Sequence, residues 1–342
     1  MKSNVIPLIP NTAETISLTS STGISEVETL MNALAQGSRF EFAGQMVKEH
    51  LSTGGKRIRA RLALSSAAAL GSSRGMSVPW AAAVELLHNA TLIHDDIQDG
   101  DQVRRGQPTT WVRHGQAQAI NAGDLLLMLP FLALSQLQTS DSVRWQLSWR
   151  LADQAASIVR GQVEEMTLLE KEDLSFESYI RAVNGKTSGL FSLPVEGSAL
   201  LSGHSSESAR RIGEAFTGLG TLFQLQDDVL DLYGQKGRQM AGMDICEGKV
   251  SALVVRHVEA KPEQRDLLLS ILRLPREETT EAHIAQMSQA FKDSGALDWV
   301  LEDIHQLNQA VQSDQYLHRH PQLFALAQEL CNVALKPIQF MF

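Results

Sequence analysis

Two clusters of aspartate share one spacing, and each follows a long apolar segment. They are Asp95-Asp96-Ile97-Gln98-Asp99 and Asp227-Asp228-Val229-Leu230-Asp231. On a helix, residues four apart share one face, so the first and last carboxylates of each cluster repel unless a cation lies between them. Hard divalent cations, Mg²⁺ above all, bind through a few carboxylates, water and substrate phosphates. One such cluster is more often a solvated helix end, but two with the same spacing predict a metal site for a phosphorylated substrate.

Basic residues form separate groups along the chain. A glycine turn, Gly54-Gly55, leads into Lys56-Arg57-Ile58-Arg59, and a helix start with nearby cations favours an anion. The spacing is not that of a P-loop. Further cations are Arg104, Arg105, Lys186 and Lys249. Separate basic and acidic groups suit a pair of diphosphates, one bridged to metal and the other held by Arg and Lys.

The elements that must position these residues are predicted to be helices. Apolar residues recur at spacings of three and four, and no hairpin signal joins two β-rich runs. We expect one all-α domain over residues 24–342, a large helical bundle with a buried centre, behind a flexible tail at 1–23. The helical segments are 25–35, 40–51, 56–70, 78–97, 116–137, 143–169, 187–201, 207–233, 250–259, 281–292 and 319–335.

Composition narrows the class of protein. The chain has 342 residues, 43% of them hydrophobic, with a net charge of −9. This excludes disorder for most of the chain and argues against nucleic acid as a partner. Two cysteines cannot form a disulfide framework. The longest apolar run, Leu125 to Leu134, has 10 residues, whereas a membrane span needs about 20. With no convincing signal peptide, we expect a cytoplasmic protein without a transmembrane segment.

The motifs resemble the all-trans polyprenyl diphosphate synthases of the farnesyl and geranylgeranyl type. The resemblance extends from Gly54 to Lys249 and implies a single all-α domain of the isoprenoid synthase type around a deep central cavity. It also implies a homodimer. The matching blocks, in the family's order, are GGKRIR, LLHNATLIHDDIQD, RRGQPT, AGDLLL, GQVEEM, GKTSGLF, FQLQDDVLDLYG and DICEGK.

The resemblance also implies a role for each matching residue. The implied cofactor is Mg²⁺, about three ions per active site. Its ligands would be Asp95, Asp96 and Asp99 on the allylic diphosphate, and Asp227 and Asp228 on the opposite wall, with Asp231 as a further candidate. Isopentenyl diphosphate would be bound by Lys56, Arg59, His88 and Arg105. The allylic diphosphate would be bound by Arg104, Lys186 and Lys249, while Thr187 and Gln224 would line the reacting centre.

The chemistry of the family explains these residue types. Cleavage of the allylic C–O bond leaves a carbocation and a diphosphate, whose charge metal ions and Lys or Arg stabilise. The double bond of isopentenyl diphosphate attacks the cation, and the released diphosphate is the expected base. Two departures stand out. Glu165 replaces the family's Asp after Gln162, and Gly237-Arg238 replaces a Gly-Lys, so Arg238 or Lys236 would substitute for that lysine.

Product length is predicted from the residues four and five before Asp95. In this family bulky aromatics there stop growth at fifteen carbons, but here they are Thr91 and Ala90. We therefore expect geranylgeranyl diphosphate, with farnesyl or longer products as alternatives. The next residues that could close the far end of the product tunnel are Leu86 and Leu87, one turn earlier. On the facing helix the candidates are Leu127, Met128 and Phe131.

Three other classes of protein fit these residues less well. A non-catalytic partner subunit typically loses aspartates from one cluster, whereas this chain keeps all six. A terpene cyclase binds one diphosphate and would not need Lys56, Arg59 and His88 as a second anion site. A bare helical scaffold leaves the polar clusters unexplained.

Overall fold

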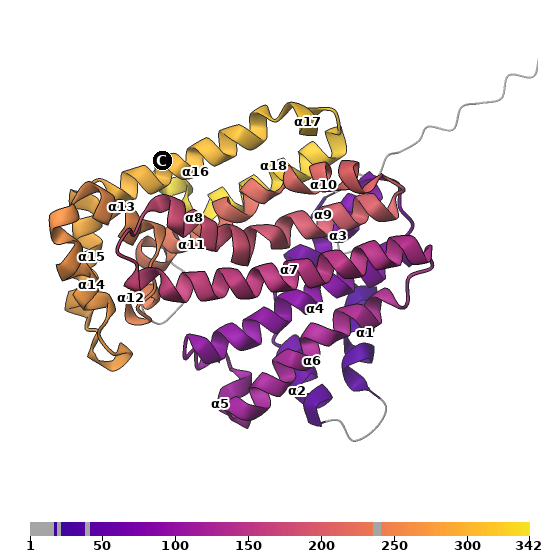
Figure 1. The fold of residues 1–342 in the computed structure, drawn as a ribbon, viewed down its shortest axis with the longest axis horizontal. Helices are drawn as coiled ribbons and strands as arrows, with labels where there is room; N and C mark the ends of the chain where they lie inside the picture. Colours follow the sequence, from indigo (N-terminus) through magenta and orange to yellow (C-terminus); the bar gives the residue numbers. More distant parts are fainter. Residues whose placement is uncertain (1–16, 19–21, 38–41, 235–240) are drawn as a thin grey trace, which may run out of the picture.

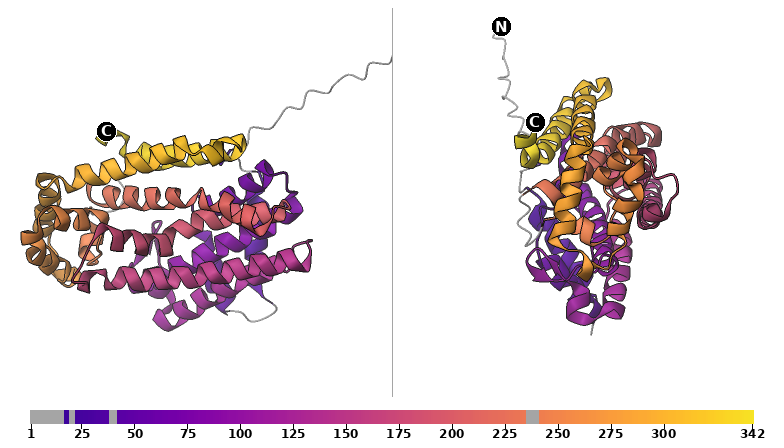
Figure 2. Two further views of the ribbon diagram at one scale, coloured as in Figure 1. Left: turned by 45° about the horizontal axis from the view of Figure 1, so that its top comes forward. Right: turned by 90° about the vertical axis from the view of Figure 1, so that its left-hand side faces the viewer.

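Long helices that run side by side dominate the molecule (Figures 1 and 2). The computed structural model describes all residues except 1–16, 19–21, 38–41 and 235–240, and the predicted all-α fold is confirmed. The helices are α1 Ile24–Gln36, α2 Phe42–Ser52, α3 Ile58–Ala69, α4 Arg74–Gln98, α5 Thr110–His114, α6 Gln116–Leu134, α7 Asp141–Thr167, α8 Phe176–Val183, α9 Gly189–Leu201, α10 Ser206–Glu214, α11 Thr217–Tyr233, α12 Met243–Cys246, α13 Ala252–Ala260, α14 Arg265–Leu272, α15 Glu281–Asp293, α16 Ala296–Ser313, α17 Gln315–His318 and α18 Pro321–Leu335.

Helix α4 passes through the centre of the core and ends at the first aspartate cluster. Its middle is fully buried, including Trp80 and Ile93. Helices α3, α6 and α9 pack around it. Trp80 donates a hydrogen bond to the carbonyl of Pro194 at 2.9 Å, and a Cβ at Gly197 would lie 2.0 Å from the Trp80 ring. This close packing fixes the position of α4 against α9 and therefore the place where the carboxylates at the end of α4 lie.

A short β-ribbon follows α4 and was not expected from the sequence. Strands β1 (Val103–Arg104) and β2 (Gln107–Pro108) pair antiparallel, with Arg104 opposite Gln107. The turn between them is Arg105-Gly106, and both residues have positive φ, 53° and 74°. That conformation is typical of a tight hairpin turn whose usual residues are Asn and Gly, so the signal was easy to miss. The ribbon holds Arg104 and Arg105 beside the end of α4.

A π-helical segment, Asn184–Ser188, interrupts the chain between α8 and α9. Such segments often lie at functional sites because they change which way side chains point. Here the segment packs closely on α7, since a Cβ at Gly161 would lie 2.4 Å from the backbone nitrogen of Lys186. Glycine at position 161 therefore lets the two backbones approach and brings Lys186 toward Glu165.

The last third of the chain covers one end and one side of the bundle. Helices α12 to α15 gather at one end, and α16 and α18 run along the side (Figure 1). Residues 17 and 18 of the predicted tail are among those described. The Leu18 N–H and the Ser17 hydroxyl each donate a hydrogen bond to Glu329 of α18, both at 2.9 Å. The boundary at residue 23 stays a prediction.

Helix α6 is long and apolar enough to cross a membrane by length and composition alone, and 44% of its most apolar stretch is buried inside the protein. A core helix passes the same test, and α6 packs along α4. Several large apolar side chains of α6 and α7 are nevertheless exposed. They are Ile120, Met128, Phe131, Leu132, Trp145, Trp149, Val159, Val163 and Met166.

Candidate active site

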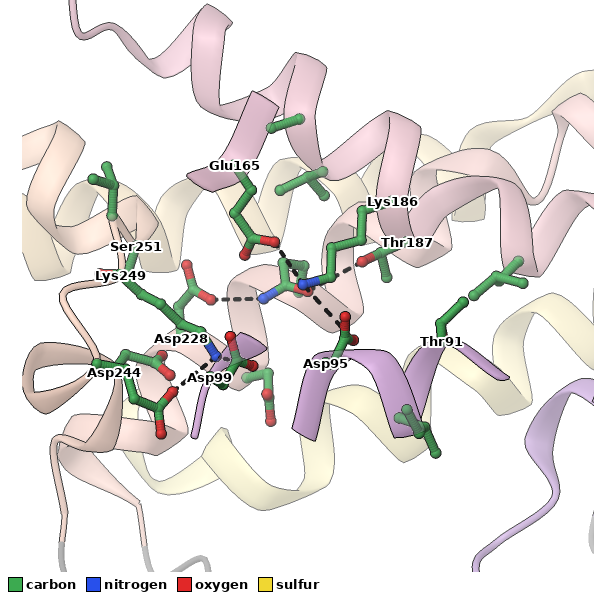
Figure 3. A pocket seen from close by; sticks show the side chains of 18 of the residues that line it. Thr91, Asp95, Asp99, Glu165, Lys186, Thr187, Asp228, Asp244, Lys249 and Ser251 are labelled. Carbon is green, nitrogen blue, oxygen red and sulfur yellow. Dashed lines mark hydrogen bonds and ion pairs between the residues drawn. The ribbon is translucent and has the colours of Figure 1, made fainter. Parts of the chain in front are cut away.

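A cavity of about 270 Å³ lies where α4, α7, α8 and α11 meet the residues that follow α12 (Figure 3). Its lining comes from residues up to 192 positions apart in the chain, from Arg59 to Ser251. The predicted site residues that line it are Arg59, His88, Thr91, Asp95, Asp99, Arg104, Lys186, Thr187, Gln224, Asp227, Asp228 and Lys249.

Five predicted residues do not line this cavity. Asp231 accepts the backbone N–H of Asp244 at 3.0 Å and so fixes the start of α12. Asp96 is buried and accepts a hydrogen bond from Arg104 at 2.6 Å. The guanidinium of Arg105 donates to the carbonyl of Gly54.

The other two are Lys56 and Ala90. Lys56 is exposed and lines a separate cavity between α3 and α18. Ala90 is fully buried in the core and lines none of the described cavities. The predicted replacement of the family's lysine by Lys236 or Arg238 lies outside the described residues.

The α4 wall of the cavity carries two carboxylates, each facing a lysine (Figure 3). Lys186 lies 3.8 Å from Asp95. It also donates a hydrogen bond to Glu165 at 2.6 Å. Lys249 contacts Asp99 at 2.7 Å and Glu247 at 2.8 Å.

The two lysines that face this wall stay charged, because nearby carboxylates raise the pKa of each. Burial opposes the charge of Lys186, but Glu165 and Asp95 outweigh it and raise the lysine's pKa. Burial likewise raises the pKa of Asp95, and Lys186 limits that rise. Each lysine thus contacts one carboxylate of α4 and a second carboxylate from another part of the chain, Glu165 for Lys186 and Glu247 for Lys249.

The α11 wall holds its carboxylate through three hydrogen bonds. Asp228 accepts from the Tyr179 hydroxyl and the Ala252 backbone N–H, both at 2.7 Å, and from the Gln224 amide at 2.9 Å. Burial raises the pKa of Asp228 to about 6, although all three hydrogen bonds favour the charged form. Thr187 in turn donates to Gln224 at 3.3 Å. Asp228 is therefore fixed in orientation before any ligand arrives.

One end of the cavity is cationic. The Arg59 guanidinium lies 4.9 Å from the centre of the Phe191 ring. Arg59 Nε and His88 Nδ1 are buried and have no hydrogen-bond partner among the described residues. Burial, and then the charge of Arg59, lower the pKa of His88 well below its usual value, so this imidazole is neutral. Unsatisfied polar atoms in a buried cationic pocket indicate a polar or anionic ligand.

Sequence reasoning missed several polar residues of the cavity. They are Asp101, Tyr179, Asp244, Glu247 and Ser251. Asp244 and Glu247 belong to the block DICEGK, which contributed only its lysine to the predicted site. The acidic pair inside that block was a usable signal. Tyr179 lies in a segment with no polar motif, and only the fold brings it to Asp228.

The donor set fits Mg²⁺. Carboxylates from α4 and α11 line the cavity, and hard oxygen ligands are those that Mg²⁺ prefers. Among the residues that the structure describes, no three acidic, imidazole or thiol side chains form a cluster that could hold an ion. Mg²⁺ characteristically takes one or two carboxylates and completes its shell with water and substrate phosphates. The cavity thus suits an ion that arrives with a diphosphate.

The fold and the cavity define a class of all-α enzymes in which two aspartate-bearing helices face each other across a deep pocket. A sequence profile of the family described as polyprenyl synthetase matches residues 41–291. The chain belongs to the polyprenyl synthetase family. Members of this family are trans-prenyltransferases that use divalent metal ions.

Individual relatives agree with this assignment. The chain is 35% identical over 255 residues to a short chain isoprenyl diphosphate synthase of Methanothermobacter thermautotrophicus, covering 73% of this chain and 77% of that protein. It is 36% identical over 230 residues to a geranylgeranyl diphosphate synthase of Saccharolobus solfataricus, covering 65% and 69%. A crystal structure of a Caulobacter crescentus polyprenyl synthase complexed with calcium and isoprenyl diphosphate superposes with a TM-score of 0.80 at 25% identity, covering 94% and 98%.

Proposed function

We propose that this protein is a Mg²⁺-dependent prenyltransferase that joins isopentenyl diphosphate head-to-tail, in the trans configuration, to an allylic diphosphate. The observation that carries the proposal is the pairing of Asp95 and Asp99 with Asp227 and Asp228 across one cavity that has a cationic end. A single diphosphate would need only one of these regions. Two prenyl diphosphates whose carbon chains are joined need both regions.

The two anions take different ends of the cavity in this proposal. Isopentenyl diphosphate binds at the cationic end, where Arg59 and His88 have unsatisfied nitrogens and Arg105 stands close to Gly54. Lys56 stays a predicted ligand of this diphosphate, although its side chain lines the separate cavity between α3 and α18. The allylic diphosphate lies between the aspartates, where Lys186 and Lys249 already contact carboxylates and Arg104 lines the wall.

The expected ligands of about three Mg²⁺ ions are the six aspartates of the two clusters. Four of them line the cavity, which makes Asp95, Asp99, Asp227 and Asp228 the principal candidates. The calcium in the Caulobacter crescentus relative shows that a divalent cation binds in that protein. When bound, Mg²⁺ neutralises charge that develops on the leaving diphosphate.

The chain's own residues account for the rest of the reaction. Lys186 and Lys249 hold the allylic diphosphate while its C–O bond breaks, and they stabilise the negative charge left on it. The double bond of isopentenyl diphosphate then forms the new C–C bond, and a proton passes to the released diphosphate. Apolar side chains of the cavity, including Leu168 and Leu190, exclude water that would quench the carbocation.

We infer geranylgeranyl diphosphate as the product, with farnesyl or longer chains as alternatives. A second cavity of about 110 Å³ begins where the first ends, because Thr91 and Asp95 line both. It runs between α4 and α7 and is lined largely by apolar side chains, among them Leu87, Leu127 and Ile158. A path of this kind accommodates a chain that grows beyond fifteen carbons, as the small side chain of Thr91 predicts.

We also propose a cytoplasmic homodimer. The exposed apolar side chains of α6 and α7 support a dimer, since the two helices pack together and exposed apolar surface marks contact sites. On α7 they form two groups, Trp145 with Trp149 and Val159 with Val163 and Met166. Within each group a spacing of three or four residues places the side chains on one face of the helix.

A diphosphate-release assay tests the reaction class. The protein is incubated with Mg²⁺ and with the allylic substrate alone, isopentenyl diphosphate alone, or both together. The proposal predicts release only when both substrates are present, and none with EDTA. Release from the allylic substrate alone would indicate a cyclase or a hydrolase. No release under any condition would favour a non-catalytic partner subunit.

A further inference from the structure

Glu85 is a buried carboxylate that none of the steps above uses. It lies on α4, three residues before His88, and is 2% exposed. Its Oε2 accepts the backbone N–H of Ala60 at 3.1 Å, in the first turn of α3. The start of α3 is therefore capped by a side chain from another helix. This revises the expectation that the backbone at the start of α3 is open to a substrate anion.

Glu85 also supplies negative charge to a cluster of cations. Its Oε1 lies 3.8 Å from Arg57 Nη1, and the Asn89 amide approaches that oxygen at 3.5 Å. Its charge raises the pKa of Arg59, whereas burial, the largest influence, and Arg105 lower it. Arg57 is itself buried and donates to the carbonyl of Leu51 at 2.7 Å, so it belongs to the framework of the glycine turn.

We propose that Glu85 is a positioning residue for the isopentenyl diphosphate site, with two separable effects on it. By capping α3, its carboxylate fixes the turn that presents Arg59 to the cavity. By its charge, it sets how much positive potential the cluster of Arg57, Arg59 and Arg105 keeps for the incoming diphosphate. The proposal rests on the function proposed above and adds a determinant of affinity outside the cavity lining.

The two effects predict changes of opposite sign. Glu85→Gln keeps an oxygen that accepts the Ala60 N–H and removes the charge, so the site becomes more positive and binds anions more tightly. Glu85→Asp keeps the charge but withdraws the carboxylate by about one C–C bond, roughly 1.5 Å, so the cap is lost. One unit charge about 7 Å away, in an effective dielectric of about 35, changes anion affinity by about tenfold.

Glu28→Gln is the matched control. Glu28 contacts the same arginine, Arg57, at 3.3 Å, but its side chain is 47% exposed. Solvent screens an exposed charge, so the same substitution there is expected to leave affinity within about twofold.

The test is calorimetric titration of inorganic pyrophosphate into the folded variants in EDTA, which removes the metal-dependent part of binding. Arg59→Gln identifies the site, because it is expected to abolish the measured binding. We expect about tenfold tighter binding for Glu85→Gln, from the lost charge. For Glu85→Asp we expect weaker binding, by up to about tenfold, from the lost hydrogen bond at the start of α3. Steady-state kinetics should show the same opposite shifts in the KM for isopentenyl diphosphate, with kcat within about twofold.

Unchanged affinity in both Glu85 variants, or weakening in both, would overturn the proposal and leave Glu85 a residue of the fold alone. If Glu85→Gln does not fold, Glu85→Asp decides: a pyrophosphate affinity equal to that of the wild type overturns the proposal. The titration needs no turnover. A wild type that binds pyrophosphate but condenses nothing would therefore count against the proposed function and not against the role of Glu85.

Discussion

Replacing Thr91 by phenylalanine tests where the growing prenyl chain leaves the active site. Thr91 lies one helical turn before Asp95 and lines both the main cavity and the second cavity between α4 and α7. A phenyl ring at this position would fill space at the junction of the two cavities, which Thr91 and Asp95 both line. We therefore expect Thr91→Phe to stop elongation early and to make farnesyl diphosphate the main product.

The size of the effect follows from the apolar surface that the last isoprene unit would bury. Burial of one carbon contributes about 0.8 kcal/mol, so a unit of about five carbons gains about 4 kcal/mol in the second cavity. Loss of that gain slows the third condensation, from C15 to C20, by about a thousandfold relative to release. The C20 product should then fall to a minor fraction of the total.

The assay sizes the dephosphorylated alcohols formed from labelled isopentenyl diphosphate and each allylic starter. Ala90→Phe is the matched control, since it places the same ring one residue earlier on the same helix. Ala90 is fully buried and lines neither cavity, so overpacking should cost about 1–3 kcal/mol of unfolding free energy. Of the two predicted chain-length residues, the structure therefore favours Thr91.

The proposed path is wrong if Thr91→Phe is folded and active and still makes products of wild-type length. It also fails if Ala90→Phe shortens the product while Thr91→Phe does not, because the path would then follow the other side of α4.

Three further predictions concern metal ligands, anion binding and pH. Asp95→Ala and Asp227→Ala should each lower kcat by at least about a hundredfold with an unchanged far-ultraviolet circular dichroism spectrum; near-normal turnover in either would remove that residue from the metal site. Arg59→Gln should raise the KM for isopentenyl diphosphate more than Lys56→Ala does, and only the effect at the exposed Lys56 should fade in high salt. Burial, aided by nearby arginines, lowers the pKa of His50 to about 3. In the unfolded chain His50 binds a proton below about pH 6.5, whereas in the folded protein it stays neutral down to about pH 3. The free energy of unfolding is therefore highest above about pH 6.5 and is lower by about 2 kcal/mol at pH 5. Urea unfolding at pH 7 and 5 should show a smaller loss in His50→Asn, and an equal loss in both proteins would contradict the assignment.

The sequence was sufficient for the fold class and for the centre of the site. Apolar spacing predicts helices because each helix buries one face, and Asp-Asp-x-x-Asp places carboxylates on one face wherever the helix lies. Twelve predicted residues accordingly meet in one cavity. Site residues can be predicted in this way when they belong to a short motif whose spacing alone places them on one face of a helix.

Pairwise geometry across the fold could not be predicted in the same way. Nothing near Tyr179 in sequence indicates that its hydroxyl meets Asp228, 49 residues later. The same holds for Glu85, which meets Ala60 only because α3 and α4 pack together. The sequence also assigned Asp96 and Asp231 by motif alone, whereas packing turns both toward other partners.

The most direct test of the central claim is the product assay on the wild type. Purified protein is incubated with Mg²⁺, labelled isopentenyl diphosphate and each allylic starter, and the resulting alcohols are sized. We predict a C20 alcohol whose formation EDTA abolishes. A C15 alcohol or a much longer one would overturn the product assignment. No condensation with any starter would contradict the proposal that the facing aspartates and the cationic end of the cavity form the active site of a prenyltransferase.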